Sequence, residues 1–149
     1  MRVGRRHVLA GAAALAAAPR ALVAAAPVAA DPAVTAALRP VFGDRVALLA
    51  LVTLVVPEVA ENAASVQVTV GFAGPEPPKR LVLVAPGNPN PLAAEYRFGP
   101  RAARPEVTTR LRLAGSQSIV AGAEMADGTL WAASAAVAVT AGACVDVPE

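Results

Sequence analysis

The chain of 149 residues contains 13 Lys and Arg, 11 Asp and Glu, one His and one Cys, and 56% of its residues are hydrophobic. This length suits one domain of ordinary size together with a targeting segment. One cysteine cannot form an internal disulfide, and so few His and Cys exclude an ordinary zinc site and a histidine-based catalytic triad in the mature chain.

The first thirty residues have the pattern of an export signal. Basic residues come first, an apolar run follows at residues 8–18, and small residues continue to Ala30. The run is shorter than the roughly 20 residues of a membrane-spanning helix, and a proline and an arginine follow it directly. We therefore expect a cleaved signal over residues 1–30 and a mature form without a membrane anchor.

A pair of arginines marks the kind of signal. Arg5 and Arg6, followed by His7, Val8 and Leu9, resemble a twin-arginine signal. A general secretory signal with an incidental arginine pair is the alternative, because Val8 stands where phenylalanine is usual. Either route predicts a protein exported to the periplasm.

The positive charge of the whole chain belongs to this signal. Without residues 1–30 the sequence has nine basic and eleven acidic residues, a net charge of −2, although the whole chain has a pI of about 9.3. Nucleic-acid binding needs clustered basic residues that displace counterions from phosphates. The mature sequence has no such stripe, and we expect no nucleic-acid partner.

A short helix is predicted directly after the signal, over residues 32–41. Asp31 can cap its first turn, Pro32 suits the first helical position, and Gly43 stands just past its end.

From residue 46 onward the sequence has the texture of a β protein. Apolar and β-branched runs, often alternating with polar residues, are separated by Pro, Gly and Asn clusters. Residues 57–65 form a polar linker, and Asp127-Gly128 predicts a tight hairpin because glycine accepts positive φ. About seven short strands in roughly 100 residues are typical of an all-β, immunoglobulin-like sandwich. The predicted strands are residues 52–56, 66–72, 81–85, 94–98, 106–113, 117–125 and 129–139.

Two arginines share one face of the strand at residues 106–113. Its apolar residues alternate with Thr108, Arg110 and Arg112, which we therefore expect on the opposite face. Arg110 and Arg112 are candidate contacts for an anion or for a partner's carboxylate, since guanidinium groups form forked hydrogen bonds. A hydrated sheet face is the alternative.

Other residues that could carry chemistry have simpler explanations. Glu58 and Glu61 could form a carboxylate pair, but their position in the polar linker favours a solvated turn. Trp131, Tyr96 and Met125 lie on or beside predicted strands, where we expect them to pack in the core or at an interface. The sequence contains no nucleotide-binding glycine motif after a predicted strand, and we expect neither a cofactor nor a metal ion.

The single cysteine lies beyond the last predicted strand. We divide the mature chain into a sandwich at residues 31–140 and a flexible C-terminal arm at residues 141–149. Five residues separate Val139 from Cys144, so the thiol could stand about 17 Å from the sheet. Gly142 would give the arm its freedom. A thiol on such an arm can reach the active site of another protein, although an inert cysteine fits the sequence as well.

The order and spacing of several segments resemble the SoxY family, whose members are sulfur carriers. The segments that carry the resemblance are residues 57–62 (PEVAEN), 88–91 (NPNP), 109–113 (TRLRL) and 117–131, which include AEMADG at residues 123–128.

The resemblance implies an immunoglobulin-like fold, a heterodimer with a SoxZ-like subunit, and the attachment of thiosulfate to Cys144. A haem-containing enzyme would join the two sulfur atoms, and other Sox enzymes would process the bound sulfur. The domain would itself catalyse nothing and would carry no cofactor. An exported binding or scaffold module whose cysteine carries no cargo is the alternative.

The tip of the arm departs from the family pattern. SoxY chains usually end in Gly-Gly-Cys-Gly-Gly, whereas Val145, Asp146, Val147, Pro148 and Glu149 follow the cysteine here. Branched and cyclic side chains restrict the backbone, and carboxylates near a thiol disfavour its ionisation. We therefore expect a less reactive thiol and partners or cargo different from the usual ones.

Overall fold

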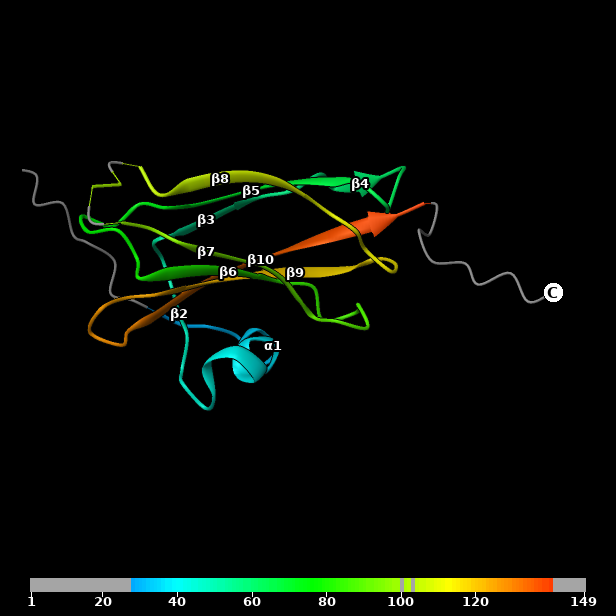
Figure 1. Ribbon diagram of the computed structural model, residues 1–149. Coiled ribbons are helices and arrows are strands. Elements are labelled where there is room, and N and C mark those ends of the chain that lie inside the picture. Colours follow the sequence, from blue (N-terminus) through cyan, green and yellow to red (C-terminus); the bar gives the residue numbers. More distant parts are fainter. Residues whose placement is uncertain (1–27, 100, 103, 141–149) are drawn as a thin grey trace, which may run out of the picture.

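The computed structural model of the chain describes residues 28–99, 101–102 and 104–140 (Figure 1). It consists of one helix and ten strands, many of them short. These elements are β1 (Val28–Ala29), α1 (Pro32–Phe42), β2 (Leu48–Leu49), β3 (Val52–Val55), β4 (Val59–Ala60), β5 (Val66–Phe72), β6 (Arg80–Val84), β7 (Leu92–Arg97), β8 (Glu106–Leu111), β9 (Gln117–Glu124) and β10 (Leu130–Val139).

The strands form two sheets packed face to face, with α1 on the outer face of the larger one (Figure 1). The larger sheet has the order β1-β2-β10-β9-β6-β7, and β4 pairs with β10 off this path. The smaller sheet has the order β3-β5-β8. The prediction of an immunoglobulin-like β-sandwich preceded by a short helix is confirmed.

The alternating pattern of β5 explains the interior of the sandwich. Val66, Val68 and Val70 are all at most 2% exposed, whereas Gln67 between them is exposed. They pack against buried residues of the larger sheet, among them Leu81 and others of β6, β9 and β10. Burial of apolar area at about 25 cal/mol per Å² holds the sheets together without a disulfide between them.

The other face of the larger sheet is covered by α1. Val34, Leu38 and Phe42 recur at helical spacing and are buried against β6, β9 and β10. The helix lies close to β9 at Gly122, where a Cβ atom would stand 2.9 Å from Leu38 Cδ2. Because β6 is covered on both faces, all four of its apolar residues are buried.

The local signals around α1 and the last hairpin are confirmed. Asp31 Oδ1 accepts a hydrogen bond of 2.7 Å from Ala33 N–H at the start of α1, and Gly43 ends the helix with φ of 70°. Between β9 and β10, Gly128 has φ of 87° and donates from N–H to the Met125 carbonyl at 3.1 Å. The helix ends one residue later than predicted, at Phe42.

The structure adds three short strands that the sequence pattern did not indicate, β1, β2 and β4. Each has two residues, and β4 lies inside the segment predicted as a polar linker. They are defined by their pairing with other strands and not by an apolar pattern. The hydrophobic periodicity of the sequence therefore could not predict them. Over the part of the chain that the structure describes, no helix has the length and apolar character needed to span a membrane.

Candidate functional site

The end of β10 leads into the C-terminal arm. Val139 is the last residue of β10, and Thr140 is the last residue that the structure describes. Gly142 and Cys144 lie outside the described residues. We therefore describe the part of the sandwich from which the arm leaves. We call it the arm base, and it consists of β4, Ser116 and residues 138–140.

The strand β4 holds the last residues of β10. Val59 and Ala60 pair in parallel with Ala138 and Val139. The Ala60 carbonyl also accepts a hydrogen bond of 3.1 Å from Thr140 N–H. The linker sequence PEVAEN thus serves as a short edge strand that fixes the direction in which the chain leaves the sandwich.

A serine fixes the other side of the arm base. Ser116 lies in the turn that precedes β9, and its Oγ accepts a hydrogen bond of 2.8 Å from Val139 N–H. Val139 is therefore held from two directions, by Ser116 and by β4. These bonds, with the one from Ala138 N–H to the Glu58 carbonyl, give a partner to each backbone N–H group of residues 138–140.

Asn88 and Gln117 connect two loops beside this base. Asn88 Oδ1 accepts from Ala114 N–H at 2.8 Å and from Gln117 Nε2 at 2.9 Å, and its Nδ2 donates to the Arg112 carbonyl at 2.7 Å. Gln117 Oε1 accepts from Gly87 N–H at 2.7 Å. The NPNP segment and the start of β9 are thereby joined, which explains why an asparagine and a glutamine stand there.

Acid-base chemistry has little support at the arm base. Glu58 and Glu61 are both exposed, and Glu58 contributes its backbone carbonyl to Ala138 N–H. Their exposure favours the solvated turn over a carboxylate pair. The arm base can position a chain segment, and the reacting group would have to come from the arm.

Arg110 of β8 and Arg112, one residue beyond its end, lie on the solvent-facing side, as predicted. Arg110 and Arg112 are exposed, whereas Val107, Leu111 and Leu113 point inward and are partly or fully buried. Arg110 Nη1 donates to Ser65 Oγ at 3.3 Å. Contact with an anion or a partner stays a prediction for both residues.

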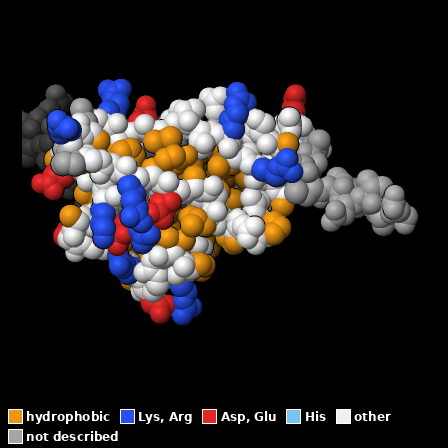
Figure 2. Space-filling view, viewed as in Figure 1, with side chains coloured by type: hydrophobic (Ala, Val, Ile, Leu, Met, Phe, Trp, Pro, Cys, Tyr) orange, Lys and Arg blue, Asp and Glu red, His pale blue; other side chains and the backbone are white. Residues whose placement is uncertain are grey.

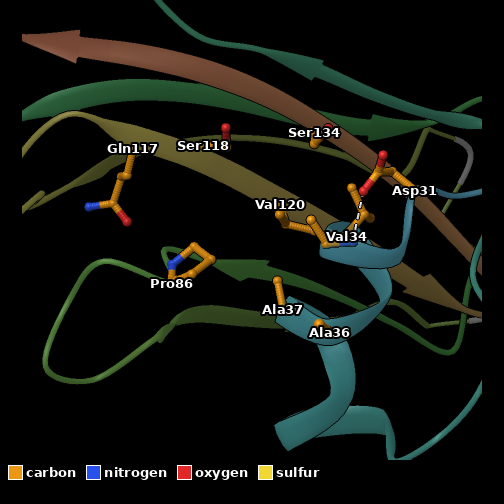
Figure 3. Close-up of a pocket in the computed structure, with 10 residues that line it drawn as sticks. Asp31, Val34, Ala36, Ala37, Pro86, Gln117, Ser118, Val120 and Ser134 are labelled. Carbon is orange, nitrogen blue, oxygen red and sulfur yellow. Dashed lines mark hydrogen bonds between the residues drawn. The ribbon is translucent and has the colours of Figure 1, made fainter.

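A pocket of about 700 Å³ lies between α1 and the outer face of the larger sheet. Gln117 and Asp31 stand at opposite ends of it, with Pro86, Ala37 and other small or apolar side chains between them (Figure 3). Among the described residues that line it, Asp31 alone is ionisable, and its carboxylate already caps α1.

Comparison with known proteins identifies the family. The family model for the sulfur oxidation protein SoxY matches residues 38–144. The sulfur carrier protein SoxY from Chlorobium limicola f thiosulfatophilum is 30% identical to the chain, with a TM-score of 0.61 over 71% of this chain and 94% of that one. The chain belongs to the SoxY family. The matched region of the SoxY model runs from α1 to the cysteine of the arm, and the arm base lies within it.

The fold is also similar to superoxide reductase. Two variants of the neelaredoxin from Ignicoccus hospitalis are each 27% identical to the chain, with TM-scores of 0.51 over 60% of this chain and 79% of those chains. No curated protein matches the chain. Within residues 28–99, 101–102 and 104–140, no group of three or more His, Cys, Asp or Glu side chains could hold a metal ion.

The sequence reasoning missed a charged cluster on the outer face of the larger sheet. Glu124, only 6% exposed, accepts from Arg45 Nη1 at 2.5 Å and from Arg80 Nε at 2.6 Å. Burial raises the pKa of Glu124, but the hydrogen bonds from Arg45 and Arg80 outweigh it, so that the pKa is lowered overall. The sequence offered one signal for this cluster, a glutamate at the end of the apolar run of β9. Its partner Arg80 could not be identified from sequence, because the pairing depends on strand register.

Proposed function

We propose that this chain is a periplasmic carrier that binds thiosulfate-derived sulfur covalently on Cys144 and presents it to the enzymes of a sulfur-oxidation system. Membership of the SoxY family carries the proposal, since the matched region extends to residue 144 and a sulfur carrier protein is among the similar structures. The carrier itself would catalyse no step.

The loading step follows from the chemistry of a thiol. The Cys144 thiolate, after losing its proton to solvent, forms an S–S bond with the terminal sulfur of thiosulfate. Two electrons leave in this step, and the proposed acceptor is a haem-containing enzyme of the same system. The product is an S-thiosulfonate on the arm, from which other Sox enzymes would release the oxidised sulfur.

The arm base supports a carrier function for a physical reason. Backbone hydrogen bonds from β4 and a side-chain hydrogen bond from Ser116 hold the chain up to Thr140. The attachment residue follows four positions later. A chain end held at Thr140, with the cysteine only four residues later, would suit a thiol that must enter the cleft of another protein.

Export and pairing complete the proposal. The basic, apolar and small-residue pattern of residues 1–30 supports export to the periplasm, by the twin-arginine route. Family membership supports a heterodimer with a SoxZ-like subunit. A SoxZ-like chain that co-purifies with this protein from the periplasm would support the pairing, and this protein recovered alone would contradict it.

Replacement of the cysteine tests the function in cells. We expect Cys144→Ser to abolish thiosulfate-dependent oxygen uptake, because a hydroxyl cannot form the disulfide-type bond. Ser118→Ala, at an exposed serine on β9 outside the arm base, is the matched control and should leave the uptake unchanged. Undiminished uptake with Cys144→Ser would instead favour a binding module whose cysteine carries no cargo.

A further inference from the structure

We propose that the charged cluster on the outer face of the larger sheet binds a small divalent oxoanion of the sulfate type. The site is a pocket of about 370 Å³ beside the end of α1. Four basic side chains and one carboxylate line it: Arg45, Lys79, Arg80, Arg97 and Glu124. Figure 2 shows Lys and Arg side chains gathered with acidic ones at the lower left of the molecule.

Strand register brings three of these residues into one row. Glu124 of β9 pairs with Arg80 of β6, and Arg80 pairs with Arg97 of β7. Arg45 approaches from the loop after α1. Arg80 also lies with its guanidinium carbon 4.6 Å from the centre of the Phe42 ring, which holds it against the helix.

The carboxylate of Glu124 is fully used by its neighbours. Its two oxygens accept from Arg45 Nη1 and from Arg80 Nε. It therefore serves to fix two guanidinium groups, and its charge is already compensated. An anion that enters the pocket would bind the remaining N–H groups of the basic side chains, because each oxygen of Glu124 already accepts from an arginine.

The cluster has an excess of positive charge. Its four basic residues face two carboxylates, Glu124 and Glu95, since Glu95 pairs with Arg97 at 2.9 Å and with Arg80 at 3.5 Å. Two positive charges remain, and like charges directly opposite on paired strands, here Arg80 and Arg97, destabilise a sheet. A divalent anion would balance this excess completely.

Several donors are left for such a ligand. Within the described part of the chain, no hydrogen bond engages Lys79 Nζ, Arg45 Nε and Nη2, or Arg97 Nη1 and Nη2. Guanidinium groups bind tetrahedral oxoanions through pairs of parallel N–H groups, and lysine adds a point charge. Arg80 is only 21% exposed, so part of the site is shielded from water. Sulfate, thiosulfate and phosphate share the required shape and charge.

The site is distinct from the attachment residue of the proposed function. Val137 pairs with Gln117 at one end of the β9–β10 hairpin, and Leu130 pairs with Glu124 at the other (Figure 1). Seven residues of strand cover about 23 Å, and β10 continues for two residues beyond Val137. An arm of five residues reaches about 17 Å, so Cys144 could not bring its cargo to this pocket of the same chain.

Titration of the full chain with sodium sulfate, thiosulfate and phosphate tests the proposal, with sodium chloride at equal ionic strength as the reference. Amide chemical shifts of Arg80, Arg97 and Glu124 report on the site. We expect saturable shifts with the divalent anions, and about tenfold weaker binding for Arg97→Gln, which removes a pair of charged donors. Arg97 is 77% exposed, so this variant should fold, as its circular dichroism would establish.

Three further variants locate the binding. Arg104→Gln changes an exposed arginine away from the pocket and should bind as the parent chain does, and Cys144→Ser should as well. The proposal is overturned if chloride produces the same shifts, if no saturable binding occurs, or if Arg97→Gln binds with unchanged affinity. Loss of binding in Arg110→Gln alone would place the anion on β8 and would overturn it too.

Discussion

The two ends of the β9–β10 hairpin are held by different forces. At the arm base and beside it the bonds are between uncharged groups, from Ser116 and β4 and from the amides of Asn88 and Gln117. At the turn end the described ion pairs gather around Glu124 and around the loop after α1. The difference points to a separation of roles, in which the sulfonate that we propose on the arm would be kept out of reach of this basic cluster of its own domain.

The largest effect is expected at the charged end. Glu124→Gln keeps the shape of the side chain but removes the charge that compensates Arg45 and Arg80. Because the carboxylate is buried, we expect the free energy of unfolding to fall by about 2–4 kcal/mol. Urea denaturation measures this, and Glu61→Gln at an exposed position should change it by less than about 0.5 kcal/mol. A loss as small as that of the control would show that the cluster contributes little to stability.

Acidification should weaken the same end. The pKa of Glu124 is lowered from its ordinary value of 4.5 in the folded chain, despite burial, by hydrogen bonds from Arg45 and Arg80. The stabilisation is therefore complete above about pH 4.5 and is lost as the pH falls through the lowered folded value. Thermal melts from pH 7 to pH 3 should fall less steeply for Glu124→Gln than for the parent chain. Parallel pH profiles would contradict this assignment.

A smaller loss of stability is expected beside the arm base. Asn88→Ala removes three hydrogen bonds that join two loops, and Asn88 is partly buried. We expect a loss of about 1–2 kcal/mol in the free energy of unfolding. Asn90→Ala, two positions later at an exposed asparagine, is the matched control for urea denaturation. If both variants lost the same amount, the hydrogen bonds of Asn88 would not be the cause.

The smallest and most local effect is expected at Ser116. Ser116→Ala removes the acceptor of Val139 N–H, which should change global stability by less than about 1 kcal/mol. Hydrogen exchange of the Val139 amide should accelerate, since its protection depends on that bond. Ser118→Ala serves as control. An unchanged exchange rate would mean that β4 alone fixes the arm base.

The elements that could be predicted from sequence are those specified by neighbours in the chain. Asp31, Pro32 and Gly43 mark a helix locally, and Asp127-Gly128 marks a hairpin in the same way. The Glu124 cluster could not be predicted, because strand register brings Glu124, Arg80 and Arg97 together and Arg45 joins them from the loop after α1. Likewise β4 has two residues, too few for any periodicity. The proposed role of Cys144 as the sulfur attachment residue rests on family resemblance. Composition and spacing alone do not distinguish it from an inert cysteine.

Sulfur transfer to Cys144 is most directly tested by intact-mass analysis of the protein from the periplasm of thiosulfate-fed cells, followed by peptide mapping. We predict a mass increase of one thiosulfate unit that maps to the C-terminal peptide, disappears on treatment with a thiol reductant and is missing from Cys144→Ser. An unmodified Cys144 under conditions in which thiosulfate is being consumed would contradict the carrier function.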